Sequence, residues 1–279
     1  MDVLWLLIPV SLVTGFYIVY KIPVVRYYMK YVIFGIILNL GSVFYTIVFL
    51  VRGKPSFSNS SEALPLLRIS QWALGLRPKI YGLENCYKFR QCVYVVNHQS
   101  FIDAVALCDL WREPSSTIVK DALRFYGLAW PLMHFMRILP IVRNDHTKAM
   151  ATMREAAEMV KHEHVNMFIF PEGTRNSSGQ LLPFKKGAFH LAIQAQIPVV
   201  AIVISCYNSF LDHKNKVFED AAYGVYVLPP IPTEGLTSAD AGNLLEQSYA
   251  AMKEIFDITA TATKDELGLD LRENLRQEH

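Results

Sequence analysis

The sequence predicts an α/β protein, with a mixed, largely parallel sheet flanked by helices and preceded by an N-terminal two-helix membrane anchor. Two observations predict the sheet. Short apolar runs alternate with longer segments of helical periodicity, and the runs are apolar at nearly every position, as in strands buried on both faces. A third observation predicts the anchor, because two long uncharged segments precede the alternating region.

Length and composition exclude several classes of protein. The chain has 279 residues, of which 52% are hydrophobic and 19% charged, so it has room for a full core and is too apolar to be disordered. The net charge is +2, and the basic excess lies beside the apolar N-terminal segments, which argues against a nucleic-acid binder. The four cysteines form no C-x-x-C pair, so we expect free buried thiols and no metal site or disulfide framework.

The two uncharged segments are Val3 to Tyr20 and Tyr31 to Val51. As a helix, the second segment reaches about 30 Å, the thickness of the hydrocarbon layer. The first segment lacks the cationic start and the small-residue cleavage site of a signal peptide, which favours an anchor. A short basic link, 21–30, joins the two segments. The sequence leaves open whether both cross the bilayer or both enter one leaflet.

We predict four regions along the chain: an anchoring helical hairpin at 1–54, a Ser-rich linker at 55–64, the α/β domain at 65–257 and a polar tail at 258–279. Within the α/β domain, we expect strands at 93–96, 138–142, 167–170, 198–204 and 223–228, with a further short run at 117–119. We expect helices at 101–112, 147–162, 185–194 and 237–256.

The first chemical motif is Asn-His-Gln-Ser-Phe-Ile-Asp at 97–103, directly after a predicted strand. Ser100-x-x-Asp103 matches a capping box with Ser100 as N-cap, which leaves His98 on the turn before the helix. The chain can fold back there and bring the imidazole to the Asp103 carboxylate, so that the other ring nitrogen is a base near neutral pH. The alternative is a polar loop residue beside a simple cap. Since no Gly-x-Ser-x-Gly elbow exists in the chain, we expect the nucleophile to come with the substrate.

The second motif is Phe-Pro-Glu-Gly-Thr-Arg at 170–175, again directly after a predicted strand. Both turns should open at the carboxyl edge of the sheet, where α/β proteins bind ligands. Gly173 allows close backbone approach, Thr174 offers a hydroxyl, and Arg175 offers a planar fork suited to a phosphate. The alternative for Arg175 is a surface ion pair with Glu172.

Three further cations follow predicted strands or begin a predicted helix. Lys185 lies at a helix start, which favours an anion, or it lies on a solvated helix face. Arg143 and Lys120 each end a strand-like run, and each could face the same edge of the sheet or lie on the surface.

Three blocks together resemble the glycerolipid acyltransferases, and within them the 1-acyl-sn-glycerol-3-phosphate acyltransferases of the animal endoplasmic reticulum. The blocks are Asn-His-Gln-Ser-x-x-Asp at 97–103, Phe-Pro-Glu-Gly-Thr-Arg at 170–175 and Pro-Phe-Lys-Lys-Gly-Ala-Phe-His at 183–190. The resemblance covers residues 30 to 257. It departs from the family at Pro140, where an aromatic residue is usual, and at Ala201, where a proline is usual.

The resemblance implies transfer of a fatty acyl group from acyl-CoA to the free sn-2 hydroxyl of lysophosphatidic acid, giving phosphatidic acid at the endoplasmic reticulum membrane. It implies His98 as general base, Asp103 as its partner, and a loop from Glu172 to Arg175 that holds the acceptor phosphate. By position, Arg143 and Lys120 match further basic residues of the family. Acyl-CoA is then a co-substrate and no cofactor is implied. We also expect backbone N–H groups at the start of the helix after Ser100 to stabilise the oxyanion.

Two other functions remain open from the sequence. The same chemistry could act on another acceptor, such as glycerol 3-phosphate or a lysophospholipid with a larger headgroup. Alternatively, the chain could be a catalytically silent lipid-binding protein of the membrane. The presence of both motifs argues against this second reading.

Overall fold

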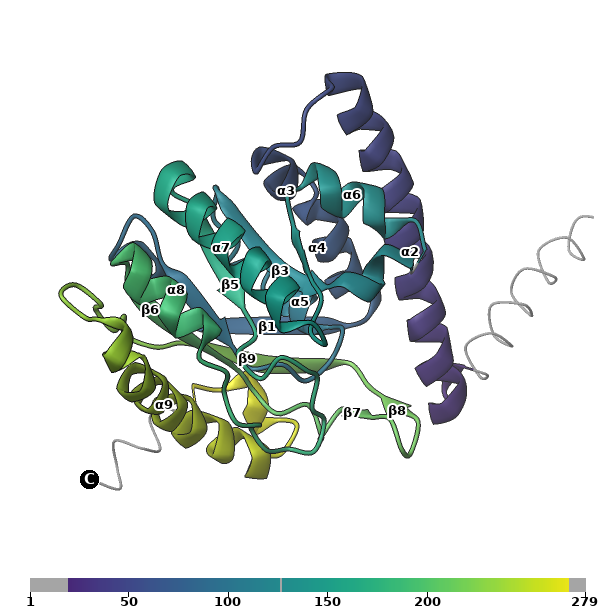
Figure 1. Ribbon diagram of the computed structural model, residues 1–279. Coiled ribbons are helices and arrows are strands. Elements are labelled where there is room, and N and C mark those ends of the chain that lie inside the picture. The colour runs from purple at the N-terminus through teal and green to yellow at the C-terminus, as the bar shows by residue number, and fades with distance from the viewer. Residues whose placement is uncertain (1–19, 126, 271–279) are drawn as a thin grey trace, which may run out of the picture.

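A seven-stranded sheet forms the centre of the computed structural model, which describes residues 20–125 and 127–270 (Figure 1). The strand order is β1-β9-β6-β2-β5-β3-β4. The pairing of β6 with β9 is antiparallel and the other pairings are parallel. The mixed, largely parallel sheet is therefore confirmed. The seven strands are β1 (Leu76–Tyr81), β2 (Val93–Val96), β3 (Ser115–Lys120), β4 (Leu139–Ile141), β5 (Asn166–Ile169), β6 (Val199–Ile204) and β9 (Ala221–Val227).

The middle strands are buried on both faces, which is why they are apolar throughout. In β2, Val93 and Val95 join one hydrophobic cluster while Tyr94 and Val96 join the cluster on the opposite face. Helices α7 (His146–Glu163), α8 (Gly187–Ala195) and α9 (Ala241–Thr261) cover the first face (Figure 1). The second face is covered by α4 (Leu64–Ala73), α5 (Asp103–Ala106) and the first turns of α2 (Pro23–Arg52).

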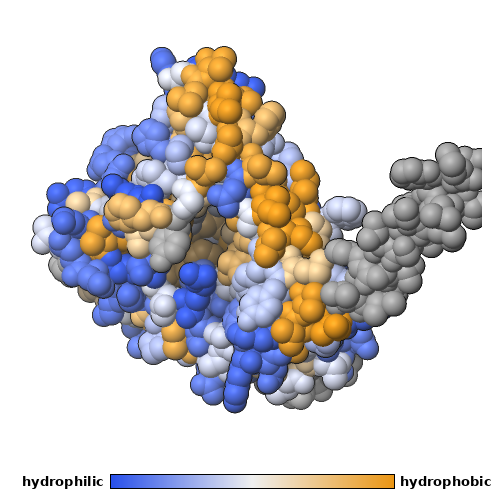
Figure 2. All heavy atoms as spheres, turned by 90° about the vertical axis from the view of Figure 1, so that its right-hand side faces the viewer, coloured by the Kyte–Doolittle hydropathy of each residue, from blue (hydrophilic) through white to orange (hydrophobic). Residues whose placement is uncertain are grey.

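Helix α2 is the one helix in the described ranges that is long and apolar enough to cross a membrane, with a mean hydropathy of 2.2 over its best window. It confirms the second predicted apolar segment. Figure 2 shows apolar side chains along the length of this helix, beside a hollow in the same face of the molecule. The exposed apolar side chains of α2 include Val32, Ile36, Leu40, Val43, Phe44, Ile47, Leu50 and Val51. The first predicted segment, Val3 to Tyr20, lies outside the described residues except for its last residue.

The other face of α2 packs on the domain. Gly41 lies against Leu66 of α4, so closely that a Cβ at this position would meet a Leu66 methyl carbon at 2.1 Å. Near the other end of α4, the fully buried Lys30 donates to the Leu74 carbonyl and to Asp220, both at 2.6 Å. The prediction of a link at 21–30 is therefore wrong, since the helix begins at Pro23 and includes most of that segment. Within the helix, Lys30 is buried against its partners on the domain.

Two other boundaries differ from the sequence prediction. The expected linker 55–64 contains α3 (Ser58–Glu62), where Asn59 donates to the Phe135 carbonyl at the end of α6 (Ala129–Phe135) and Ser60 accepts from Trp111. The expected polar tail is ordered up to residue 270. Within it, Leu267 is fully buried and the Gly268 carbonyl accepts from Tyr81. Both segments are packed parts of the fold.

The predicted helix at 101–112 is also shorter, since α5 ends at Ala106 and the chain continues in turns. A short hairpin, β7 (Leu211–Asp212) with β8 (Val217–Phe218), follows β6 and lies near the first turns of α2 (Figure 1). Strands β2, β3, β4, β5 and β6 all run in one direction, so their carboxyl ends meet at one edge of the sheet. Both sequence motifs lie at this edge.

Candidate functional site

His98 and Asp103 are in direct contact on the turn that follows β2. The Nδ1 atom of His98 lies 2.6 Å from Asp103 Oδ2, and because an ionised carboxylate only accepts, Nδ1 carries the proton. The free ring nitrogen is then Nε2. The His98 side chain is 17% exposed and the Asp103 side chain 1% exposed, so the carboxylate is shielded while the ring can be reached. The ring stacks on Phe170 at 4.1 Å, which fixes its plane.

The capping interaction differs from the predicted box. Asp103 Oδ2 also accepts from the backbone N–H groups of Gln99 (2.8 Å) and Ser100 (2.9 Å). The bond from the Ser100 N–H is one of the two that the predicted capping box requires. The Ser100 hydroxyl has no hydrogen-bond partner within the described part of the chain, and the N-cap of α5 is Ile102. The expectation for the oxyanion is also wrong for these two N–H groups, because both already bind the carboxylate.

The loop after β5 is tied to the same turn through Glu172. Its Oε1 accepts from the backbone N–H of His98 at 2.7 Å, and its Oε2 accepts from Leu182 at 3.0 Å. The carboxyl group is buried, and burial raises its pKa against the lowering effect of these two N–H donors. In return, the N–H of Asn176 donates to the His98 carbonyl at 2.8 Å. Glu172 therefore joins the two motifs as a strut, and it forms no ion pair with an arginine of the described ranges.

Gly173 is favoured at its position by its backbone conformation, and the Lys185 side chain lies close to it. Its φ is +70°, and a Cβ there would meet Lys185 Nζ at 2.8 Å. The stem of Lys185 thus lies over the loop, and its amine is brought to the motif. Thr174 and Arg175 follow on the exposed side of the loop.

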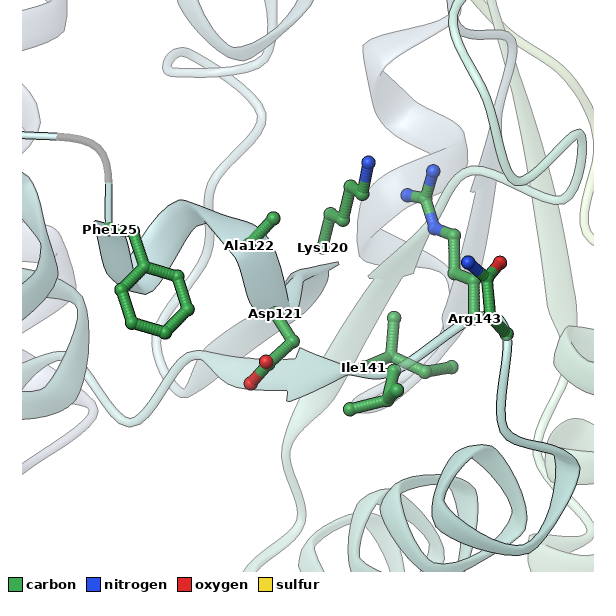
Figure 3. A pocket seen from close by; sticks show the side chains of 8 residues that line it. Lys120, Asp121, Ala122, Phe125, Ile141 and Arg143 are labelled. Carbon is green, nitrogen blue, oxygen red and sulfur yellow. The ribbon is translucent and has the colours of Figure 1, made fainter.

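Arg143 and Lys120 lie at the same edge, at the ends of β4 and β3. Together with Phe125 and Ile141 they line a pocket of about 210 Å³, into which cationic and apolar side chains both point (Figure 3). Partial burial and then the charge of Arg175 lower the pKa of Arg143. Cations at one edge of a sheet raise the positive potential there, which favours an anion.

Helix α2 contributes to the surroundings of the site. Tyr31 and Phe34 pack against Phe101, at ring distances of 4.9 and 4.7 Å, and Phe101 lies two residues before Asp103. The Nδ1 atom of His213, on the β7–β8 hairpin, lies 3.0 Å from the Tyr27 hydroxyl and 3.1 Å from the Tyr31 hydroxyl. The apolar helix is therefore in contact with the turn that carries His98 and Asp103.

Sequence reasoning missed the amides that hold this turn. The Asn97 side chain exchanges two hydrogen bonds with the backbone of Ile204, at 2.9 and 2.7 Å. The Gln99 side chain donates to the carbonyls of Ile204 and Ser205 and accepts from the Tyr207 N–H at 3.1 Å. The sequence does place an amide side chain on each side of His98, directly after a strand. Because buried amides need fixed partners, this pattern could have predicted that Asn97 and Gln99 hold the turn.

The nine residues predicted for the site fall into two groups. The structure brings His98, Asp103, Glu172, Gly173 and Lys185 into one connected network, with Arg175 and Thr174 on the same loop. Arg143 and Lys120 lie along the edge in the adjoining pocket, and the field of Arg175 reaches Arg143.

Known proteins are similar to this chain in sequence. The family model named Acyltransferase matches residues 77–205. The human 1-acyl-sn-glycerol-3-phosphate acyltransferase beta is 36% identical over 232 residues, which cover 83% of this chain and 84% of that protein. The human alpha form is 35% identical over 235 residues, covering 84% of this chain and 82% of that protein.

A solved structure shares the fold. The crystal structure of the 1-acyl-sn-glycerophosphate (LPA) acyltransferase PlsC from Thermotoga maritima superposes with a TM-score of 0.66 at 21% identity, covering 84% of this chain and 97% of that chain. The likeness to the human proteins extends over most of both chains. The protein belongs to the 1-acyl-sn-glycerol-3-phosphate acyltransferase family.

Proposed function

We propose that the protein transfers a fatty acyl group from acyl-CoA to the sn-2 hydroxyl of 1-acyl-sn-glycerol 3-phosphate (lysophosphatidic acid), forming phosphatidic acid. The observation that carries this proposal is the 2.6 Å contact between His98 Nδ1 and Asp103 Oδ2, beside a loop that presents Arg175. The names of the relatives support the acceptor, because all those described above are acyltransferases of 1-acyl-glycerophosphate.

His98 acts as the general base. Its Nε2 takes the proton of the acceptor hydroxyl while the oxygen attacks the carbonyl carbon of the thioester. A C–O bond forms, the tetrahedral intermediate collapses, the C–S bond breaks, and the CoA sulfur leaves with the proton from the imidazolium. Asp103 stays ionised and holds Nδ1–H, which keeps Nε2 free in the neutral ring. Since the thioester is already activated, the reaction needs no covalent enzyme intermediate.

The cations at the edge hold the acceptor phosphate. Arg175 offers a bidentate fork and Lys185 lies over the same loop, while Arg143 and Lys120 extend the positive field into the adjoining pocket. Glu172 does not touch the phosphate in this proposal. Its two hydrogen bonds set the position of the loop relative to His98.

The acceptor reaches the site from a membrane. Helix α2 is a candidate membrane segment, and its Tyr31 and Phe34 contact Phe101 on the catalytic turn. A lysophospholipid therefore has a short route from the apolar surface to the base. We propose the endoplasmic reticulum as the location, as the family resemblance implies.

The proposal is tested with the purified full-length protein in phospholipid vesicles, supplied with labelled oleoyl-CoA and separately with lysophosphatidic acid, glycerol 3-phosphate and lysophosphatidylcholine. We expect labelled phosphatidic acid as the main product. The His98→Ala variant should lose turnover by about 10²-fold or more while it still binds lysophosphatidic acid. A preference for another acceptor would show that lysophosphatidic acid is not the main substrate. Equal turnover by the variant would show that His98 is not the base.

A further inference from the structure

Asp103 is held strongly through one of its two carboxylate oxygens. Oδ2 accepts from His98 Nδ1, from the Gln99 N–H and from the Ser100 N–H, at 2.6, 2.8 and 2.9 Å. Oδ1 is buried and, by strict donor–acceptor geometry, has no partner among the described residues. A buried carboxylate oxygen without a donor is costly, because it has lost its water and gained nothing in exchange.

A second buried polar group without a partner belongs to the same hydrogen-bonded region. The Tyr207 hydroxyl is also buried and, by the same geometry, has no partner among residues 20–125 and 127–270. The Tyr207 N–H donates to Gln99 Oε1, and the Gln99 N–H donates to Asp103, so two hydrogen bonds place the two side chains in one small region. After burial, the charge of Asp103 is the largest cause that raises the pKa of Tyr207, which indicates that the phenol lies close to the carboxylate.

We propose that Tyr207 is a positioning residue for the reaction, and that its hydroxyl donates a hydrogen bond to Asp103 Oδ1. One buried donor and one buried acceptor would then satisfy each other, as buried polar groups in folded proteins almost always do. Hydrogen bonds at a reactive site are often long or poorly aligned without substrate and tighten in the complex. We expect this bond to close in the complex.

The bond gives the carboxylate a second fixed point. The three hydrogen bonds at Oδ2 restrain rotation of the carboxylate about the Cβ–Cγ bond, and a bond at Oδ1 restrains it further. With Oδ1 bound to Tyr207, the plane is fixed and Nε2 keeps its direction toward the acceptor hydroxyl. Tyr207 takes part in no proton transfer, and no bond to it forms or breaks. The inference rests on the proposed role of His98 as the base.

The chain offers a matched control in Tyr223. Its hydroxyl is equally buried and also has no partner in the described ranges, and its ring meets Tyr207 edge to face at 5.6 Å. The charge of Asp103 raises the pKa of Tyr223 as well, but without a hydrogen bond. The titratable groups around Asp103 are His98, Glu172, Tyr207 and Tyr223.

The experiment compares Tyr207→Phe with Tyr223→Phe in the acyl-CoA and lysophosphatidic acid assay. We expect Tyr207→Phe to lower kcat by about tenfold, the effect of losing one hydrogen bond to a charged group, while both KM values stay unchanged. Without the phenol donor, the negative charge of the carboxylate stabilises the protonated imidazole more strongly. The acidic limb of the kcat profile should therefore move to higher pH. Tyr223→Phe should change neither kcat nor the profile.

A second measurement does not depend on activity. We expect Tyr207→Phe to lower the Tm of the wild-type protein, since it leaves Oδ1 unpaired. When the same substitution is made in the Asp103→Ala variant, we expect no further loss, because the phenol there has no acceptor to lose. Tyr223→Phe should leave the Tm unchanged or raise it. A wild-type kcat and profile in Tyr207→Phe, equal effects in the two phenylalanine variants, or additive Tm losses in Asp103→Ala/Tyr207→Phe would overturn the inference. If the wild-type protein is inactive but the Tm losses of Asp103→Ala and Tyr207→Phe are not additive, only the proposed function is overturned.

Discussion

The backbone N–H of His98 donates to Glu172 Oε1 at 2.7 Å, so one hydrogen bond joins the two motifs that lie 74 residues apart. The Asn176 N–H donates back to the His98 carbonyl at 2.8 Å. The proposed base and the proposed phosphate loop are consequently one unit at the sheet edge. A change in the carboxyl group of Glu172 should disturb both.

Glu172→Gln tests this strut. An amide has one acceptor oxygen, so the backbone N–H of either His98 or Leu182 loses its partner, at a cost of about 1–3 kcal/mol in the free energy of unfolding. We expect a lower Tm and a kcat about 10-fold lower, because the base is displaced. Calorimetry and steady-state kinetics measure these effects. The exposed Glu254→Gln is the matched control, and an equal response from both variants would contradict the strut.

Arg175→Ala tests the phosphate site. The loss of a bidentate charged contact should raise the KM for lysophosphatidic acid by about 10- to 100-fold, with little change in the KM for acyl-CoA. Arg175→Lys should restore only part of the affinity, because an ammonium group lacks the planar fork. Initial rates with each substrate varied in turn give both constants. An unchanged acceptor KM in Arg175→Ala would assign the phosphate to other cations.

The cysteines should be inert in the folded protein. All four are buried, and burial raises the pKa of Cys86 to about 11 and the pKa values of Cys92 and Cys108 to about 12. The thiolate is the reactive form, so few thiols react at pH 8. We expect no adduct by mass spectrometry after a brief N-ethylmaleimide treatment, full activity afterwards, and four adducts in denaturant. Inhibition by modification of one native thiol would point to an acyl-cysteine route.

His213 should make the attachment of α2 sensitive to acid. Burial, and then the charge of Lys216, lowers its pKa. A neutral Nδ1 can accept from the Tyr27 hydroxyl, whereas a protonated one cannot. Because the unfolded chain binds this proton more tightly, stability is lost as the pH falls below about 6.5.

The test compares the wild type with His213→Gln, whose amide oxygen accepts at any pH. We expect the Tm of the wild type to fall more steeply between pH 7.5 and pH 5.5, by thermal unfolding in detergent. Parallel Tm curves for the two proteins would show that the pKa of His213 is the same in the folded and the unfolded chain.

The parts of the site that the sequence predicted are local. His98 and Asp103 are five residues apart on one turn, so a strand, a tight turn and a cap were sufficient to bring them together. The parallel sheet follows from apolar strands that alternate with helices, and it places both motifs at one edge.

The parts that the sequence did not predict depend on contacts between distant segments. The Glu172 strut and the amide of Gln99 need the neighbouring ends of β2, β5 and β6, which only the strand order provides. Lys30 resembles a link residue in the sequence, and its burial requires Asp220, 190 residues further along the chain. The short α5 likewise reflects turns that hydrophobic periodicity alone does not resolve.

The contact of Tyr31 and Phe34 with Phe101 has a kinetic consequence. In the proposed function, this contact attaches the turn that carries the base to a membrane helix, so that the protein and its acceptor share a plane. For a lipid confined to that plane, encounters depend on molecules per unit of surface area. Diluting the acceptor with inert lipid should then slow the reaction even when its amount per millilitre is constant.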